Sequence, residues 1–194
     1  MTNLELLWTW LQYVYGNDGA AAILGNVRAE SAYIPCNLQN SYEKKLGYSD
    51  VTYTAAVDSG AYDRNKFAHD CAGYGLAQWT HWSRKQNLYD FIKERKLSIG
   101  DLKGQCDFMI TEIRGYGLAE QLASPDLSLR DKVAIVLRKY EKPADQSEAN
   151  VDRRTGYARE ILYQMTASAH PGSGHAELVA LLRKTADELE KLTT

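Results

Sequence analysis

Cysteine is scarce in this sequence. The chain of 194 residues contains three cysteines, Cys36, Cys71 and Cys106, which are odd in number and far apart. Small secreted domains that depend on disulfide bonds carry a dense and even-numbered set of cysteines instead. The sequence therefore argues against a disulfide scaffold, and we expect three reduced thiols in a protein made in the cytosol.

Long apolar runs and a large excess of either charge are also lacking. No stretch approaches the roughly 20 apolar residues that a membrane-spanning helix needs. The first residues, MTNLELLWTWLQYVYG, include Glu5 and no basic residue, so they predict a helix of the fold rather than a signal peptide. The formal net charge of −2 gives no general attraction to polyanions. We expect neither membrane insertion nor a nucleic-acid partner.

Helical periodicity, by contrast, is abundant. Hydrophobic residues make up 44% of the chain, which is enough to bury the core of one domain. Apolar residues recur every three or four positions near the start, and Gly16 separates a first helix from a second one over about 19–31. Further helical patterns lie over about 82–95, 99–113, 118–123, 129–141 and 145–165.

The segment between these helical parts has no sustained period. Residues 32–66 are rich in Asn, Ser, Asp and Tyr, and a short glycine-flanked apolar run follows at 74–79. A long irregular segment inside a compact domain is usually functional. The sequence thus predicts a mainly α domain with a small irregular or β lobe, spanning residues 1–170.

A helical tail is predicted after this domain. Pro171, Gly172, Ser173 and Gly174 form a break, after which apolar residues recur every three or four positions. We therefore assign residues 171–194 to a linker and a C-terminal helix. That helix could fold back on the core or associate with a second copy of itself.

Glu30 is the acidic residue that the helical pattern singles out. Ile23, Val27 and Glu30 fall at positions i, i+4 and i+7, so the carboxyl group shares a stripe with apolar side chains and should be partly buried. Burial disfavours the charged form of a carboxyl group, which makes Glu30 a candidate general acid. The alternative is that Glu30 merely caps its helix, or pairs with Arg28 or a distant arginine.

A metal site is the rival constellation. Cys36, His69, Cys71 and Cys106 would be enough ligands for zinc, but only His69 and Cys71 are close in sequence. Compact zinc sites have closely spaced ligand pairs. We therefore expect no metal and no other cofactor. A zinc hydrolase is the alternative that this set of residues leaves open.

Three motifs in order give the sequence a family resemblance. They are GNVRAESAY at residues 25–33, GYGLAQWT at 73–80 followed by Trp82, Ser83 and Arg84, and YEKP at 140–143. The chain resembles the phage tail lysozyme family over about residues 4–165, and is similar to goose-type lysozymes and soluble lytic transglycosylases. In that superfamily a Glu-Ser pair closes the catalytic helix and a Gly-Leu-Ala-Gln strand forms the cleft floor. The resemblance implies a lysozyme-like fold.

The resemblance also implies roles for individual residues. Glu30 matches the catalytic acid, Ser31 its partner, and the run 75–78 the cleft strand. Gly75 would let the backbone approach a sugar, and the Gln78 amide could read an acetamido or hydroxyl group. Tyr74 and Trp79 could stack on sugars or pack beneath the floor. The expected substrate-binding residues are Ser31, Tyr74, Gln78, Trp79, Thr80 and Tyr140.

The second carboxylate has several candidates. Goose-type enzymes carry an Asp shortly before the cleft strand, where this chain has Asp70, and a further Asp where this chain has Thr80. We take Asp70 as the water-activating base that the resemblance implies. Asp58 or Asp63 could serve instead, or no protein base at all, since a lytic transglycosylase uses one Glu as acid and then as base.

The implied function is a muramidase that cleaves the β-1,4 bond between N-acetylmuramic acid and N-acetylglucosamine of bacterial peptidoglycan. The alternatives are a lytic transglycosylase of the same fold and a non-catalytic phage protein that binds cell-wall glycan. We expect synthesis in the host cytoplasm without a signal peptide and action on the cell wall, either as a holin-released endolysin or as a virion-mounted lysin. The C-terminal helix could also lead to a missing wall-binding module.

Overall fold

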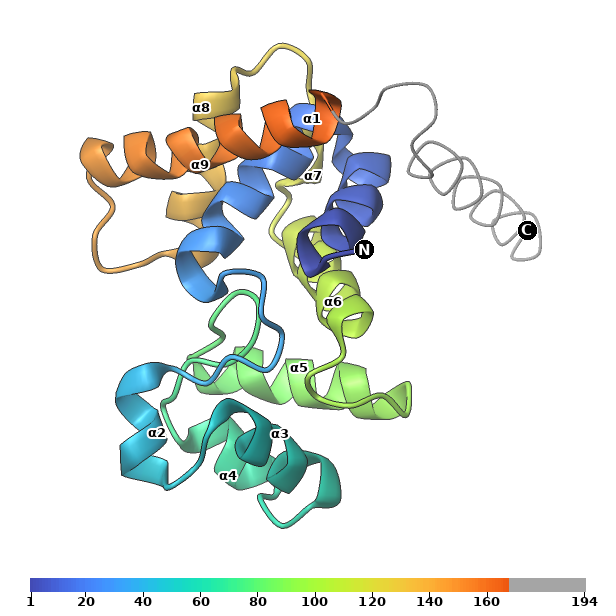
Figure 1. The fold of residues 1–194 in the computed structure, drawn as a ribbon, viewed down its shortest axis with the longest axis vertical. Helices are drawn as coiled ribbons and strands as arrows, with labels where there is room; N and C mark the ends of the chain where they lie inside the picture. The colour runs from blue at the N-terminus through green and yellow to red at the C-terminus, as the bar shows by residue number, and fades with distance from the viewer. Residues whose placement is uncertain (168–194) are drawn as a thin grey trace, which may run out of the picture.

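The computed structural model describes residues 1–167 and confirms a mainly α, lysozyme-like fold (Figure 1). One group of helices, α1 and α7–α9, packs together, and a second group, α2–α5, lies beside it, with α6 between them. The elements are α1 (Asn3–Ser31), α2 (Asn40–Leu46), α3 (Asp50–Ser59), α4 (Arg64–His69), α5 (Trp82–Glu94), α6 (Leu102–Gly115), α7 (Ala119–Ala123), α8 (Leu129–Ile135), the π-helix η1 (Val136–Glu141) and α9 (Glu148–Ala167).

The first helix carries the expected break at Gly16. Thr2 and Glu5 form a capping box at its start, which satisfies amide groups of the first turn. Gly16 has φ 68° and ψ −178°, a backbone conformation that glycine adopts without the steric cost of a Cβ atom. The chain therefore changes direction before the second half of α1, whose small residues Ala20, Ala21 and Ala22 are fully buried.

Close packing of α1 against α9 places the end of α1. A Cβ atom on Gly25 would lie 2.8 Å from the Arg154 carbonyl oxygen and 2.9 Å from the Ala158 Cβ. Contacts this short show that the two helix backbones approach as closely as glycine permits. The last turn of α1, which carries Glu30, is thus fixed by a helix more than a hundred residues later.

The lobe that we expected to be irregular differs from the prediction. Residues 32–66 contain α2, α3 and the start of α4, and among the described residues the only β pairings are the isolated bridges Leu38–Tyr74 and Tyr74–Trp79. Ser49 and Asp63 cap α3 and α4 through their side chains. These helices are too short to show an apolar period, so their polar caps were the available signal.

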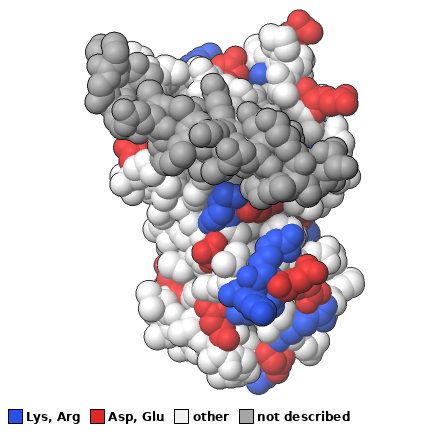
Figure 2. Space-filling view, turned by 90° about the vertical axis from the view of Figure 1, so that its right-hand side faces the viewer, with Lys and Arg blue, Asp and Glu red and all other residues white. Residues whose placement is uncertain are grey.

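The predicted helix over 129–141 is present and continues from α8 into η1. The predicted domain boundary at residue 170 and the predicted helix over 171–194 lie outside the described residues. No helix within residues 1–167 has the length and apolar character to cross a membrane. On the face shown in Figure 2, basic and acidic side chains are intermixed.

Candidate active site

Two cavities that share lining residues adjoin the end of α1 and together form a cleft, and Glu30 lines both of them. A cavity of about 880 Å³ is lined by Glu30 together with residues of the 77–84 and 140–143 segments. A second cavity of about 490 Å³ is lined by the last turn of α1 and by residues 37–41. Glu30, Gln39 and Gln78 line both cavities. A chain-like ligand that occupied both would therefore pass directly by the Glu30 carboxyl group.

Glu30 is held by a distant arginine. Its side chain is 19% exposed, which agrees with the expected partial burial, and its Oε1 accepts a hydrogen bond of 2.7 Å from Nη2 of Arg154. Arg154 is 4% exposed and also donates to Asn26 Oδ1 at 3.1 Å. Arg28 pairs with Glu160 instead. The buried guanidinium thus fixes the orientation of the Glu30 carboxyl group.

The floor of the cleft is the loop that contains the Gly-Leu-Ala-Gln run. The Gln78 side chain lines both cavities, and its amide donates to the backbone and side-chain oxygens of Asn37 at 3.1 and 2.7 Å. Gly75 has φ +74°, and a Cβ there would meet Gln105 Oε1 at 2.5 Å. The expectation that Gly75 admits a sugar is wrong, because the buried Gln105 side chain occupies that approach.

Two of the expected sugar-binding aromatic residues are inside the core. Tyr74 and Trp79 are both 0% exposed. The Tyr74 hydroxyl pairs with Thr54 Oγ1 at 2.7 Å, and Trp79 Nε1 donates to Glu112 Oε2 at 2.7 Å. Their rings therefore support the floor from beneath, and stacking on a sugar is ruled out by their burial.

Ser31 joins the last turn of α1 to the floor. The residue is 3% exposed, and its Oγ donates a hydrogen bond of 2.8 Å to the Leu76 carbonyl oxygen. This bond links two of the three resemblance motifs through residues that are 45 positions apart in the chain. Ser31 borders the smaller cavity, but its hydroxyl is already engaged by the protein, so its role here is to hold Glu30 and the floor together.

Glu112 organises the far wall of the larger cavity. Its carboxylate accepts two hydrogen bonds from Arg84, at 2.8 and 2.7 Å, and one from the Tyr140 hydroxyl at 2.7 Å. The Arg84 guanidinium also lies over the Tyr140 ring, 4.8 Å from its centroid. Tyr140 and Arg84 line the cavity as fixed parts of its wall, and Thr80 lines it as an exposed residue of the loop.

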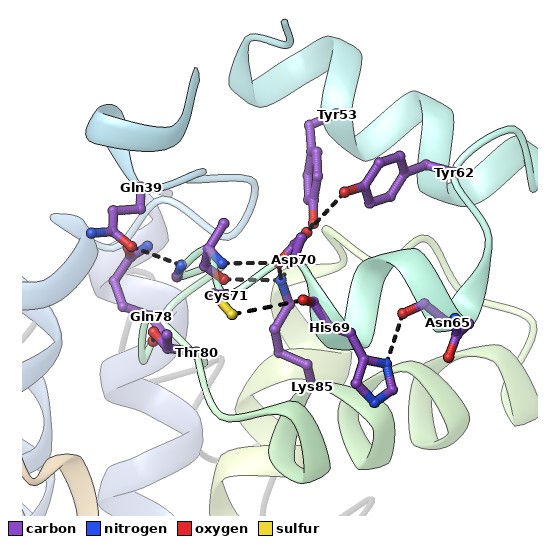
Figure 3. Close-up of polar contacts among 12 residues, drawn as sticks. Gln39, Tyr53, Tyr62, Asn65, His69, Asp70, Cys71, Gln78, Thr80 and Lys85 are labelled. Carbon is purple, nitrogen blue, oxygen red and sulfur yellow. Dashed lines mark hydrogen bonds and ion pairs between the residues drawn. The ribbon is translucent and has the colours of Figure 1, made fainter. Parts of the chain in front are cut away.

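Asp70 belongs to a different environment from the one expected of a water-activating base. Its side chain is 3% exposed and forms an ion pair with Lys85, which is fully buried. Figure 3 shows the Asp70 carboxyl group turned toward Tyr53, Tyr62 and Lys85. Burial lowers the pKa of Lys85, and the charge of Asp70 opposes this shift.

The structure therefore does not bring Asp70 to the cleft. Gln78 and Thr80, which line the larger cavity, lie apart from the Asp70 carboxyl group in Figure 3. The Asp70 side chain is buried, and its two oxygens accept hydrogen bonds from Lys85, from two tyrosines and from the Ala72 amide. These contacts leave no place for an attacking water. The position argues for a structural role and against the expected catalytic one.

The other candidate aspartates are also engaged elsewhere. Asp58 binds Lys93, Ser98 and the Ile99 amide, and Asp63 caps α4 through the Lys66 amide. Neither lines the cavities at Glu30. The second carboxyl group of the larger cavity is Glu141, at the end of η1.

The cysteines do not converge. Cys106 is buried, Cys36 is partly buried and Cys71 is exposed, and all three are free thiols. Within residues 1–167 no group of three or more His, Cys, Asp or Glu side chains is placed to hold a metal ion. The Cys36, His69, Cys71 and Cys106 set therefore does not form a ligand cluster.

Sequence reasoning missed two residues of the site. Arg154 belongs to none of the motifs, and an arginine in a helix is usually exposed. The available signal was its position, because Val151, Thr155 and Ala158 place it on the buried face of α9. Glu141 is part of the YEKP motif, in which the sequence predicts a role only for Tyr140. The available signal was Pro143, because a helix usually ends at or before the residue that precedes a proline, which places Glu141 at the helix end.

A mainly helical domain with a partly buried glutamate at a helix end, which lines two adjoining cavities, is typical of a lysozyme-like protein. The chain belongs to the phage tail lysozyme family, whose model matches residues 5–165. A search of curated protein sequences finds no match to it. Membership of this family implies a glycosidase-type enzyme that degrades peptidoglycan of the bacterial cell wall.

Proposed function

We propose that this chain is a muramidase that cleaves the β-1,4 bond between N-acetylmuramic acid and N-acetylglucosamine, with Glu30 as the general acid. The observation that carries the proposal is the position of Glu30, which lines both cavities of the cleft. A glycan that filled both would have sugars on either side of the carboxyl group. The scissile bond would then lie beside the proton donor.

The chemistry needs one proton transfer in each direction. Glu30 donates its proton to the glycosidic oxygen as the bond from C1 to that oxygen breaks. Water then adds to C1, and the proton that it loses returns to the Glu30 carboxylate. Arg154 and Ser31 hold the end of α1 in place during this cycle.

A lytic transglycosylase is the second candidate, and the burial of Asp70 favours it. None of the three candidate aspartates lines either cavity, so among residues 1–167 no aspartate is placed at the cleft as a base for water. In a transglycosylase the hydroxyl group of the muramic acid itself attacks C1, and an anhydro sugar forms. Glu30 would serve first as acid and then as base.

Mass spectrometry of the muropeptides released from purified cell walls tests both candidates. Hydrolysis gives a reducing-end muramic acid, whereas transglycosylation gives the lighter anhydro end. Glu30→Gln keeps the shape of the side chain but cannot donate a proton, so release should fall by roughly 10²–10⁴-fold with the fold intact. Wild-type release by a folded Glu30→Gln variant would remove Glu30 from its role. Binding without any release would indicate a glycan-binding protein instead.

A further inference from the structure

Glu141 has an unused carboxyl oxygen in the wall of the cleft. The residue ends η1, and the chain turns there because Lys142 adopts φ 52° and donates its amide to the Leu137 carbonyl oxygen at 2.8 Å. The Glu141 Oε1 is out of contact with solvent, and no atom of residues 1–167 is hydrogen-bonded to it. A π-helical turn is often found at functional sites. An unsatisfied buried oxygen in such a turn calls for an explanation.

The charged groups around Glu141 come from four helices. Glu30 on α1 and Glu112 on α6 are acidic, and Arg84 on α5 and Arg154 on α9 are basic. Both arginines direct their hydrogen bonds to other acids, since Arg84 binds Glu112 and Arg154 binds Glu30. Within the described part of the chain, residues 1–167, Glu141 is therefore left without an ion-pair partner of its own.

This environment favours the neutral form of Glu141. Burial and the negative charge of Glu30 raise the pKa of the Glu141 carboxyl group well above its usual range, against the opposing charges of Arg84 and Arg154. Two carboxyl groups in one cleft with different surroundings divide the acid and base forms between them. The two carboxyl groups of the larger cavity have such different surroundings, because Glu30 binds the Arg154 guanidinium whereas the Glu141 Oε1 has no hydrogen-bond partner among residues 1–167.

We propose that Glu141 is the proton-carrying partner of Glu30, a neutral carboxyl group that supplies the proton with which Glu30 cleaves the glycan. This inference rests on the proposed role of Glu30. The proton passes from the Glu141 carboxyl group to the Glu30 carboxylate, and then to the glycosidic oxygen as its bond to C1 breaks. The attacking hydroxyl or water releases one proton, which returns to the pair. Glu141 thus acts only through Glu30. It is a positioning residue, which holds the proton that Glu30 transfers to the glycan.

The variant Glu141→Gln separates this role from a structural one. Glutamine has the shape and the zero charge of the neutral acid, so packing and any hydrogen bond to the glycan are retained, but the proton is lost. We expect kcat to fall by about tenfold or more with KM little changed, and the alkaline limb of the pH profile to move to lower pH. Glu141→Asp should recover part of the rate. Glu94→Gln, at an exposed position on α5, is the matched control.

A second measurement does not depend on catalysis. Infrared difference spectra at neutral pH should show the carbonyl stretch of a protonated carboxyl group that is present in wild type and in Glu30→Gln but absent in Glu141→Gln. Wild-type kcat across the pH range in Glu141→Gln, or the absence of that band, overturns the inference. If wild type releases no muropeptide, the proposed function fails, while the band still reports on Glu141.

Discussion

Nη2 of Arg154 on α9 lies 2.7 Å from Oε1 of Glu30 on α1, across 124 positions of the chain. The bond depends on the close approach of the two helices at Gly25. The packing of α1 against α9 is therefore coupled to the orientation of the Glu30 carboxyl group, because the same pair of helices provides both contacts.

The variant Gly25→Ala tests this coupling. Its Cβ would lie 2.8 Å from the Arg154 carbonyl oxygen, so α9 must shift, at a cost of about 1–3 kcal/mol in the free energy of unfolding. We expect glycan cleavage by the folded variant to fall as Arg154 moves away from Glu30. The control is Gly156→Ala on α9, where the added Cβ meets nothing within 4 Å. That variant should be more stable by about 0.5–1 kcal/mol and fully active. Normal cleavage by folded Gly25→Ala would show that helix packing at Gly25 and the orientation of Glu30 are not coupled.

Replacing Asp70 should cost stability rather than chemistry. Asp70→Asn leaves the fully buried Lys85 without its counter-charge, and breaking a buried pair in this way costs about 3–5 kcal/mol. Urea denaturation would show the loss. The rate per folded molecule should stay close to wild type, because Asp70 does not line the cleft. The double variant Asp70→Asn with Lys85→Met should recover stability. A stable but inactive Asp70→Asn would instead restore Asp70 as the catalytic base.

The stability of the protein should depend on pH through Glu141. Its folded-state pKa is raised, so from about pH 4.3 upward the unfolded chain releases this proton while the folded chain keeps it. The stability that Glu141 contributes is complete below that pH and is lost as pH rises toward the folded-state pKa. Glutamine does not titrate, so Glu141→Gln should gain stability relative to wild type with increasing pH, by at most about 1.4 kcal/mol per pH unit. Urea unfolding of both proteins at several pH values measures this, and a constant difference would contradict it.

Chelators and reductants should leave activity unchanged. The three cysteines are free thiols, and the described residues hold no cluster suited to a metal ion. Cell-wall clearing in the presence of a chelator or a reductant, together with metal analysis of the purified protein, gives the answer. Stoichiometric zinc, or inactivation that added zinc reverses, would contradict the expectation.

The sequence by itself determined the local features of the site. The apolar period of α1 was sufficient to place Glu30 on a half-buried stripe, and Gly16 marked the break in the helix, because both depend on neighbours within a few turns. The order of the motifs also indicated the family, which the match over residues 5–165 confirms.

Only the tertiary structure decided which distant groups meet. Asp70 was adjacent to the cleft motif in sequence, yet Lys85 and two tyrosines enclose it. Tyr74 and Trp79 had the right chemistry for sugars, yet they are buried beneath the floor. Glu141 reaches the cleft because η1 ends beside α1. Periodicity reports the face of an element, but the partner of that face is set by packing between segments far apart in the chain.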